Sequence, residues 1–419
     1  MVALDSSYDV VVIGAGAAGL VAAAEAAARG LRTLLVEKNR RPGVKILISG
    51  GTRCNLTHAT DKWGIVRAYG EQGNFLHSAL AALSPSDLVA LIEAEGVPTK
   101  VEETGKIFPV SNRATDVLDA LLRYFQRSGA ELALAEPVAA IDRLPAGFLV
   151  KTAIREIAAR KVIVTVGGKS YPGSGTTGDG YAWAAALGHT VVPPRAALVP
   201  LTTSEAWVHS LSGVTIPDVA LMLSSPGGHD ARSKPQPSVR GSLLLTHFGL
   251  SGPVALDISR EFTALAEPAA AALLADFLPG SKSDQLEQEL RQAAAADGKR
   301  QVASLLGDRL PRRLVEALLI RAGLPLELRG AELSKAARTA LVSALKSTLI
   351  PITGTRGFAK AEVTAGGVSL DQIDSRTMES KLVPGLYFAG EILDLDGPIG
   401  GYNFQAAFST GVLAGRSVS

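Results

Sequence analysis

The segment Gly14-Ala15-Gly16-Ala17-Ala18-Gly19 constrains the fold of this chain more than any other feature. It follows a β-branched run, Tyr8 to Ile13, and opens an alanine-rich stretch, Ala17 to Arg29. A second apolar run, residues 33–36, then ends at the acidic Glu37. Strand, glycine-rich turn, helix, strand and acid within about 30 residues predict the βαβ unit of a Rossmann-like α/β fold.

Each glycine of this turn has its own physical role in such a unit. Gly14 permits the tight turn, Gly16 lets backbone approach a pyrophosphate, and Gly19 lets the helix pack closely on the strand. The N–H groups at the helix start stabilise phosphate oxygens. Glu37 can accept hydrogen bonds from a ribose 2′-hydroxyl and would repel a 2′-phosphate. The unit therefore favours FAD or NAD over NADP.

The chain returns to this fold near its C-terminus. Two further buried strands, Lys161 to Val166 and Leu386 to Ala389, are followed by glycine, and a final helix is expected from Asn403 to Ala414. A flavin dinucleotide is long enough to touch several strand ends of one sheet. Because this chain completes its sheet only at the C-terminal end, we favour FAD over NAD.

The residues between the two ends have a different pattern. Short alternating runs from about residue 195 predict antiparallel strands, and residues 268–346, rich in Ala, Leu, Arg and Glu, predict several helices. We therefore expect a Rossmann-like FAD-binding domain formed by both chain ends, interrupted by a β-barrel-like and helical insertion. The expected boundaries are 1–194 and 351–419 for the FAD-binding domain, 195–266 for the β insertion and 267–350 for the helical insertion.

Composition limits the classes of function. Lys and Arg total 42 and Asp and Glu 40, a net charge of +2, so the chain lacks the basic character of a nucleic-acid binder. The single cysteine, Cys54, excludes an intrachain disulfide and favours the reducing cytoplasm. No run reaches the ~18 uninterrupted apolar residues of a membrane span. Six histidines without a spaced pair argue against a metal site.

The segment Lys45 to Asn55 (KILISGGTRCN) resembles the K-(x)3-SGGGRCN signature of the BaiN/YhiN-like bacterial flavoproteins. That group includes enzymes described as bile-acid enone reductases and aminoacetone oxidases. The resemblance covers nearly the whole chain in the family's order, through Ser170-Tyr171-Pro172, 176–180 (TTGDG), 246–253 (THFGLSGP), 363–368 (VTAGGV) and 386–403 (LYFAGEILDLDGPIGGYN). It departs at Thr52, where the family usually has a third glycine, and at residues 165–168, where Thr-Val-Gly-Gly replaces Ala-Thr-Gly-Gly.

The resemblance implies noncovalently bound FAD. The glycine turn should hold the pyrophosphate, Glu37 the adenosine ribose and the backbone of Val138 the adenine. Lys45 and the loop from Ser49 to Asn55 should lie along the ribityl chain and the flavin ring. The full set of expected cofactor-binding residues is Gly14, Gly16, Ala17, Ala18, Gly19, Glu37, Lys38, Lys45, Ser49, Gly50, Arg53, Cys54, Asn55, Val138, Gly167, Gly168, Asp179, Gly390, Glu391, Asp394, Asp396, Gly400, Gly401, Tyr402 and Asn403.

The C-terminal block carries the rest of this expected site. Gly390 and Glu391, with Asp394 or Asp396, should meet the ribityl and phosphate region. Residues 400–403 begin the last helix, which should face the pyrimidine edge of the flavin. A helix N-terminus there would stabilise the negative charge of reduced flavin.

Four other features have open interpretations. Residues 173–178 also spell GxGxxG, but they lie past their strand and no acid follows about 20 residues later. Cys54 is either a thiol beside the flavin or a packed side chain. His247 is a candidate acid or base toward substrate, with Tyr402 as the second candidate, and the alternative is a histidine that merely stabilises a turn. The basic stretch Arg309 to Arg321 is typical of a solvated helix face.

The expected function is that of a cytoplasmic FAD-dependent oxidoreductase. Its flavin would transfer a hydride to or from a small or medium-sized ketone, enone or amine. NADH or NADPH would bind transiently as reductant, because no second Rossmann unit is visible. Neither a nucleic acid nor a membrane is expected as partner. Two alternatives remain, a flavin-dependent RNA-modifying enzyme, against which the balanced charge counts, and a flavin-binding sensor or interaction protein without turnover.

Overall fold

The computed structural model describes residues 8–224, 238–266 and 271–419, and the chain divides into two compact units. The first unit combines the two chain ends, up to Ala196 and from Glu362, and the second spans Ala197–Ala361. Each unit has its own buried hydrophobic core. The prediction that both chain ends build one α/β domain is confirmed.

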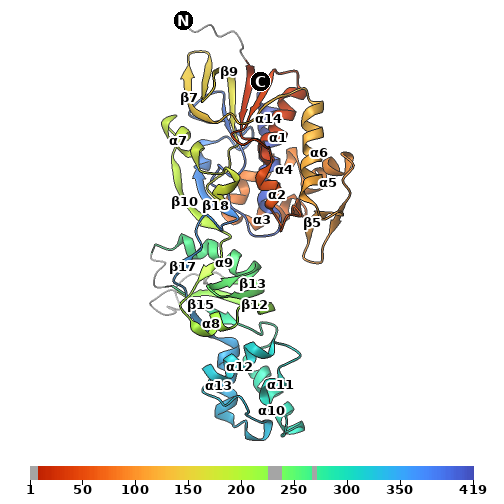
Figure 1. Cartoon of the computed structure of the whole chain (residues 1–419), viewed down its shortest axis with the longest axis vertical. Coiled ribbons are helices and arrows are strands. Elements are labelled where there is room, and N and C mark those ends of the chain that lie inside the picture. Colours follow the sequence, from red (N-terminus) through yellow and green to blue (C-terminus); the bar gives the residue numbers. More distant parts are fainter. Residues whose placement is uncertain (1–7, 225–237, 267–270) are drawn as a thin grey trace. The chain divides into compact units, whose positions relative to one another are not determined.

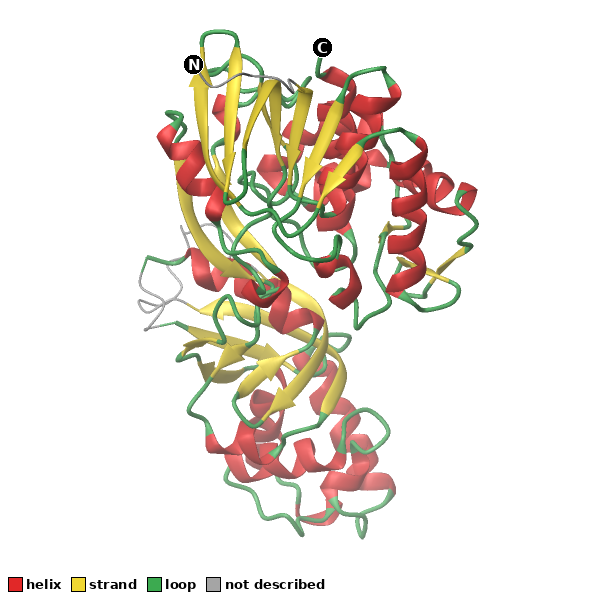
Figure 2. Ribbon diagram, turned by 45° about the horizontal axis from the view of Figure 1, so that its top comes forward, coloured by secondary structure: helices red, strands yellow, loops and turns green. Residues whose placement is uncertain are grey.

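The first unit is organised around a sheet whose strands are among the yellow arrows of Figure 2. This sheet has seven strands in the order β6-β2-β1-β9-β8-β7, with β19 also paired to β9. Strands β6, β2, β1, β9 and β19 are parallel, whereas β7 and β8 form an antiparallel hairpin. The first half of β9 pairs with β8 and its last residues with β19. The strands are β1 (Tyr8–Ile13), β2 (Thr33–Val36), β6 (Glu131–Ala133), β7 (Val138–Leu144), β8 (Gly147–Thr152), β9 (Glu156–Val164) and β19 (Leu386–Phe388).

Helices α1 (Ala17–Ala28) and α14 (Tyr402–Ser417) pack side by side with their backbones in contact (Figure 1). A Cβ atom at Gly411 would overlap the carbonyl oxygen of Ala18, and one at Gly415 would overlap that of Ala22. This register shows that the two helices run in the same direction. Glycine and alanine therefore bring the first and last helices together, and both N-termini lie toward the same end of the sheet.

The remaining elements of the first unit surround this sheet. A small sheet, β3-β5-β4, and a two-stranded sheet, β10-β18, accompany it. The elements are α2 (Val44–Ile48), β3 (Thr57–His58), α3 (Lys62–Ala68), η1 (Gly70–Leu76), α4 (His77–Ala82), α5 (Pro85–Ala94), β4 (Thr99–Val101), β5 (Lys106–Pro109), α6 (Ala114–Arg127), η2 (Pro172–Ser174), α7 (Asp179–Ala186), β10 (Val191–Ala197), β18 (Val363–Val368) and η5 (Leu370–Gln372).

Residues 70–94 match a membrane-crossing helix by length and composition alone. In the structure they are three consecutive short helices, η1, α4 and α5. Leu76, Leu80 and Leu88 of this stretch are buried in the core of the first unit. Glu71 and Asp87 interrupt it, so it is not an uninterrupted apolar run.

The second unit contains a seven-stranded antiparallel sheet in the order β16-β15-β12-β13-β14-β11-β17. Sheet and helices share one buried core. The unit continues to Ala361, later than the return at residue 351 that the sequence pattern predicts, because β16 and β17 pair within this sheet. The elements are β11 (Leu201–Thr202), α8 (Ala206–Ser210), β12 (Thr215–Ser224), β13 (Ser238–Thr246), β14 (Gly249–Ser251), α9 (Pro253–Ala264), β15 (Ala272–Asp276), α10 (Ser283–Ala296), α11 (Val302–Leu305), α12 (Arg312–Arg321), η4 (Gly330–Glu332), α13 (Lys335–Lys346), β16 (Thr348–Pro351) and β17 (Gly354–Thr355).

The helical prediction for residues 268–346 is wrong for one segment. Residues 272–276 form strand β15, which pairs with β12 and β16. Leu273 and Ala275 alternate as buried residues, and alanine and leucine do not by themselves distinguish a buried strand from a buried helix. Residues 267–270, where the predicted helical part begins, lie outside the described residues.

Candidate functional site

The three glycines of the first turn have different surroundings. Gly14 has φ +100°, and a Cβ atom there would lie 2.8 Å from the carbonyl oxygen of Thr165. A Cβ atom at Gly19 would overlap the carbonyl oxygen of Gly14, whereas one at Gly16 would meet no heavy atom within 4 Å. Packing therefore requires Gly14 and Gly19, and only Gly16 faces open space. No side chain caps α1, so its first N–H groups and the space at Gly16 fit a pyrophosphate.

Glu37 is buried directly beside this turn. Its Oε2 accepts a hydrogen bond of 2.7 Å from the N–H of Ala15, and its Oε1 accepts one of 2.8 Å from the N–H of Asn39. Each carboxylate oxygen can accept a second hydrogen bond. The backbone carbonyl of Glu37 also accepts from the N–H of Glu136, which leads into β7 and Val138. Glu37 and the strand that is expected to contact the adenine are thus joined at one end of the sheet.

Lys38 and Asp179, both expected at the cofactor, pair with each other. Lys38 Nζ lies 2.6 Å from Asp179 Oδ2 and donates to Thr177 Oγ1. Burial raises the pKa of Asp179, but the hydrogen bonds from Lys38 and Thr177 outweigh it, so that the pKa is lowered. The second GxGxxG segment is thereby folded onto the first βαβ unit, where Asn39 Nδ2 also donates to the carbonyl oxygen of Ser174. It is a packed turn before α7 rather than a strand–turn–helix unit.

Lys45 and Glu391 meet although 346 positions separate them. Lys45 Nζ donates to Glu391 Oε2 and, at 2.6 Å, to Ser170 Oγ. Ser170 Oγ in turn donates to Glu391 Oε1 at 2.6 Å, and the N–H of Thr364 donates to the same oxygen at 2.9 Å. Ser170 and Thr364 were not among the expected site residues, although both lie in blocks that carry the family resemblance. Their side chains could be assigned only once the fold brought them to Glu391.

Tyr181 is a further residue that the sequence pattern missed. Its hydroxyl is buried and has no hydrogen-bond partner within the described part of the chain. A Cβ atom at Gly168 would come within 3.1 Å of this oxygen, so Tyr181 lies against the glycine pair that follows β9. Burial, and next the negative charges of Glu391 and Asp394, raise the pKa of Tyr181. It is therefore a protonated phenol with an unused donor beside the Lys45–Glu391 pair.

The loop from Ser49 to Asn55 has an unusual backbone. Gly50, Gly51, Thr52 and Cys54 all have positive φ, and Thr52 is fixed by its carbonyl oxygen, which accepts from the N–H of Ala114. Cys54 is fully buried in the core, and burial raises its pKa to about 12. The burial of this thiol favours the packed side chain over the reactive thiol.

Two buried oxygens beside this loop, Asn55 Oδ1 and Thr57 Oγ1, lack a hydrogen-bond partner among the described residues. An unsatisfied buried polar atom costs about 1–3 kcal/mol. These atoms therefore fit a bound group that donates hydrogen bonds. Arg53 lies beside them on the same loop, with its guanidinium 3.9 Å from the centre of the Phe108 ring and an ion pair to Glu102.

The start of α14 is held in place from several sides. Gly401 has φ +96°, and a Cβ atom there would lie 2.6 Å from the carbonyl oxygen of Thr57. The side chain of Asn403 exchanges hydrogen bonds with both backbone groups of Gly397, at 2.8 and 2.9 Å. The ring of Tyr402 stacks on His58, with centroids 4.8 Å apart. No side chain caps this helix, so its first N–H groups remain available to a ligand.

The other expected residues of the C-terminal block lie on the same side. Gly390 follows β19, its N–H donates to Thr410 Oγ1, and a Cβ atom there would approach Ala18 on α1. Asp394 is half-buried, and burial together with the charge of Asp396 raises its pKa. Residues from both chain ends therefore gather where β1, β2, β9 and β19 end, the edge at which parallel sheets bind ligands.

His247 belongs to the second unit. It is exposed in the turn between β13 and β14, which Thr246 closes by accepting from the N–H of Gly249. Its ring meets that of Phe248 edge-on at 5.1 Å. His247 makes no hydrogen bond or ion pair with any described residue, and its catalytic role stays a prediction.

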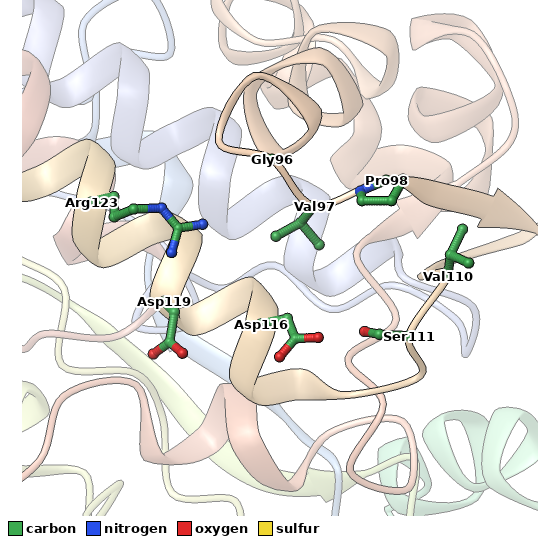
Figure 3. A pocket seen from close by; sticks show the side chains of 8 residues that line it. All are labelled: Gly96, Val97, Pro98, Val110, Ser111, Asp116, Asp119 and Arg123. Atoms are coloured by element: carbon green, nitrogen blue, oxygen red, sulfur yellow. The ribbon is translucent and has the colours of Figure 1, made fainter.

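A pocket of about 430 Å³ in the first unit is lined by other residues (Figure 3). Helix α6 contributes Asp116, Asp119 and Arg123, and residues 96–98 with Val110 and Ser111 line the rest. The pocket contains none of the residues expected from the sequence. Arg123 donates to the backbone carbonyl of Glu95, so part of its guanidinium is already engaged.

The parallel strands, the glycine turn and the buried acid define a dinucleotide-binding domain of the Rossmann type. The chain belongs to the HI0933-like family, since the profile of the HI0933-like protein Rossmann domain matches residues 8–417. The ribosomal RNA dihydrouridine synthase of Escherichia coli (strain K12) is 34% identical over 407 residues, 96% of either chain. The 3-dehydro-bile acid delta(4,6)-reductase of Clostridium scindens is 32% identical over 416 residues, 97% of this chain and 98% of that protein.

A solved structure supports the same fold. The 3-ketosteroid-delta4-(5alpha)-dehydrogenase of Rhodococcus jostii RHA1 aligns with a TM-score of 0.50 and 17% identity, covering 99% of this chain and 97% of that one. Family membership and the full-length reductase relative confirm that this protein is an enzyme, an FAD-dependent oxidoreductase.

Proposed function

We propose that the enzyme reduces a carbon–carbon double bond conjugated to a carbonyl group, with NADH or NADPH as electron donor. The observation that carries this proposal is that the names of two relatives describe the same kind of reaction. A dihydrouridine synthase saturates a ring double bond of uridine beside a carbonyl, and a 3-dehydro delta(4,6)-reductase acts on double bonds conjugated to a 3-oxo group. Both relatives cover almost the whole chain. The broader expectation of a ketone, enone or amine is thereby narrowed to an enone-like group.

Bound FAD supplies the hydride-transfer chemistry. We propose that the N–H groups at the start of α1 and the open space at Gly16 hold its pyrophosphate, and that Glu37 accepts from the ribose hydroxyls. The uncapped start of α14 stabilises negative charge at the pyrimidine edge. The orphaned oxygens of Asn55 and Thr57 supply further acceptors near this helix.

Saturating a conjugated double bond also requires a proton at the second carbon. Tyr402 and His247 are the two candidate donors. Tyr402 is fixed by stacking on His58, whose Nδ1 lies 3.2 Å from the carbonyl oxygen of Gly400. Because a carbonyl oxygen only accepts, Nδ1 of His58 carries the hydrogen of this bond. His58 thus holds the ring of Tyr402 against the turn that begins α14.

A second candidate function keeps the reaction and changes the substrate to a uridine within ribosomal RNA. Two full-length relatives, from Escherichia coli and Haemophilus influenzae, carry that name, each with 34% identity. The net charge of +2 counts against an RNA substrate. We also propose that the enzyme works in the cytoplasm, where a thiol such as Cys54 stays reduced.

One experiment tests the reaction and separates the two substrates. Protein reconstituted with FAD is reduced anaerobically with NADPH and then mixed with a 3-oxo-Δ4 steroid or with unmodified ribosomal RNA. Reoxidation with formation of a saturated product, identified by mass spectrometry, supports the proposal, and the substrate that responds decides between the candidates. Reoxidation by neither compound, but by an imine or a saturated ketone instead, would contradict it.

A further inference from the structure

We propose that Tyr171 is a cofactor-contacting residue whose ring lies against the bound FAD. The proposal rests on the FAD site of the proposed function and adds a residue that no sequence pattern assigned to that site. Of the Ser170-Tyr171-Pro172 block, only Ser170 takes part in the hydrogen bonds around Lys45 and Glu391. The tyrosine beside it has no such role within the chain.

The backbone conformation of Tyr171 costs free energy. Its φ is +56°, in the left-handed region, where a large side chain is an outlier and glycine is not. Strain of this kind is typical of ligand-binding sites. Among the described residues, the other non-glycine residues with positive φ are small, are asparagine or are buried: Thr52, Cys54, Asn112, Ala135, Leu198 and Met378. Tyr171 alone of this set combines a large side chain with exposure.

The ring of Tyr171 has no partner within the described chain. Tyr171 is 39% exposed, and it is the exposed one among the seven tyrosines, all of which the structure describes. Its phenol makes no hydrogen bond and its ring no ring contact with any described residue. Hydrogen bonding and ring packing therefore do not account for a tyrosine at this strained position.

The backbone on either side of the ring is nevertheless held firmly. The N–H and the hydroxyl of Ser174 both donate to the carbonyl oxygen of Tyr171, each at 2.8 Å. Thr176 Oγ1 donates to the carbonyl oxygen of Ser170, and the N–H of Ser170 donates to Thr364 Oγ1 at 3.0 Å. The loop thus fixes the strained residue through main-chain groups and leaves the ring unused.

The loop also runs between the two ends of the proposed cofactor site. At one end, Ser170 Oγ accepts from Lys45 Nζ, which is expected at the flavin. At the other end, the carbonyl oxygen of Ser174 accepts from Asn39 Nδ2 at 3.0 Å, and the N–H of Asn39 donates to Glu37, the acid proposed at the ribose. The tyrosine lies between these anchors. Both ring systems of FAD are flat and conjugated, and such rings stack on aromatic side chains.

The direct test is nitration of tyrosine by tetranitromethane, read by mass spectrometry of the peptides. In the apoprotein, the exposed Tyr171 should be nitrated, and saturating FAD should abolish this modification. Tyr124, whose hydroxyl donates to Glu25 at 2.7 Å, is the control and should react equally with and without FAD. Nitration of Tyr171 at the same rate in both states would overturn the proposal.

Variants separate a contact from an indirect effect. Tyr171→Gly favours the same backbone conformation and removes the ring, so FAD affinity should fall by about fivefold or more. Tyr171→Phe keeps the ring and should bind FAD like the wild type. Asn112→Gly, at another exposed residue with φ +55°, is the control and should also bind FAD normally.

If Tyr171→Gly does not fold, Tyr171→Leu replaces it and should bind FAD about two- to tenfold more weakly than Tyr171→Phe. Equal FAD affinities with and without an aromatic ring at this position would overturn the proposal. Wild-type protein that binds no FAD would instead overturn the proposed function itself, and the contact with it.

Discussion

Two of the glycine-rich turns that precede helices, one in each unit, use their glycines differently. In the first unit, Gly14 and Gly19 are required by close backbone packing, but nothing in the fold requires Gly16. In the second unit, Gly249 and Gly252 before α9 both have positive φ, and a Cβ atom at either would crowd backbone atoms of a neighbouring strand. Gly16 has neither a packing contact nor a positive φ and therefore fits the close approach of a ligand, whereas packing and backbone conformation explain both glycines of the second turn.

The largest expected effect concerns His247. If it transfers a proton to substrate, His247→Asn should slow turnover by about a hundredfold or more while FAD content and thermal stability stay unchanged. Tyr402→Phe, which removes the hydroxyl of the second candidate donor, is measured in the same way for comparison. Normal turnover in His247→Asn would assign the proton transfer elsewhere and leave the second turn without a catalytic residue.

The next effect concerns Glu37, the acid beside the first turn. Glu37→Arg removes a charged hydrogen-bond acceptor from the ribose site, and losing such a bond costs about 1.5–3 kcal/mol. FAD affinity should therefore fall by roughly ten- to a hundredfold, measured by fluorescence titration of the apoprotein. An affinity equal to that of the wild type would show that the ribose is not bound there.

Much of this arrangement could be predicted from the sequence, because it is encoded locally. The pattern of residues 8–37 predicts β1, α1, β2 and the turn between them, and all are present. Contacts between distant segments could not be predicted in this way. The meeting of Lys45 with Glu391, the hydroxyl of Tyr181 beside Gly168 and the strand at residues 272–276 depend on how the whole sheet and its loops pack.

A pair of alanine variants compares the two turns directly. Gly16→Ala keeps an ordinary backbone conformation, with φ −86°, and places its methyl group in open space, so stability should be unchanged while FAD affinity falls about tenfold or more. Gly252 has φ +85°, and a Cβ atom there would lie 2.9 Å from the backbone nitrogen of Leu244. Gly252→Ala should therefore cost about 1–3 kcal/mol of stability. Its FAD affinity should be normal. Thermal unfolding and FAD titration of both variants would show whether Gly16→Ala loses only FAD affinity and Gly252→Ala only stability.

The smallest expected effect is at Thr52, in the loop after α2. Thr52 has φ +67°, a conformation that costs a non-glycine residue about 1–2 kcal/mol. Glycine would avoid this cost, but its larger chain entropy in the unfolded state offsets part of the gain in stability. Thr52→Gly should therefore raise the free energy of unfolding by under about 1 kcal/mol, seen in a denaturant titration. A loss of stability would mean that its side chain contributes more than its backbone costs.

The most direct test of the account is the identity of the cofactor that the first unit binds. Purified protein is denatured after reconstitution with FAD, and the released small molecules are identified and quantified by mass spectrometry. The glycine turn, the buried Glu37 and the uncapped start of α14 predict one FAD per chain, released without covalent cleavage. Release of NAD, or of no dinucleotide at all, would contradict the account.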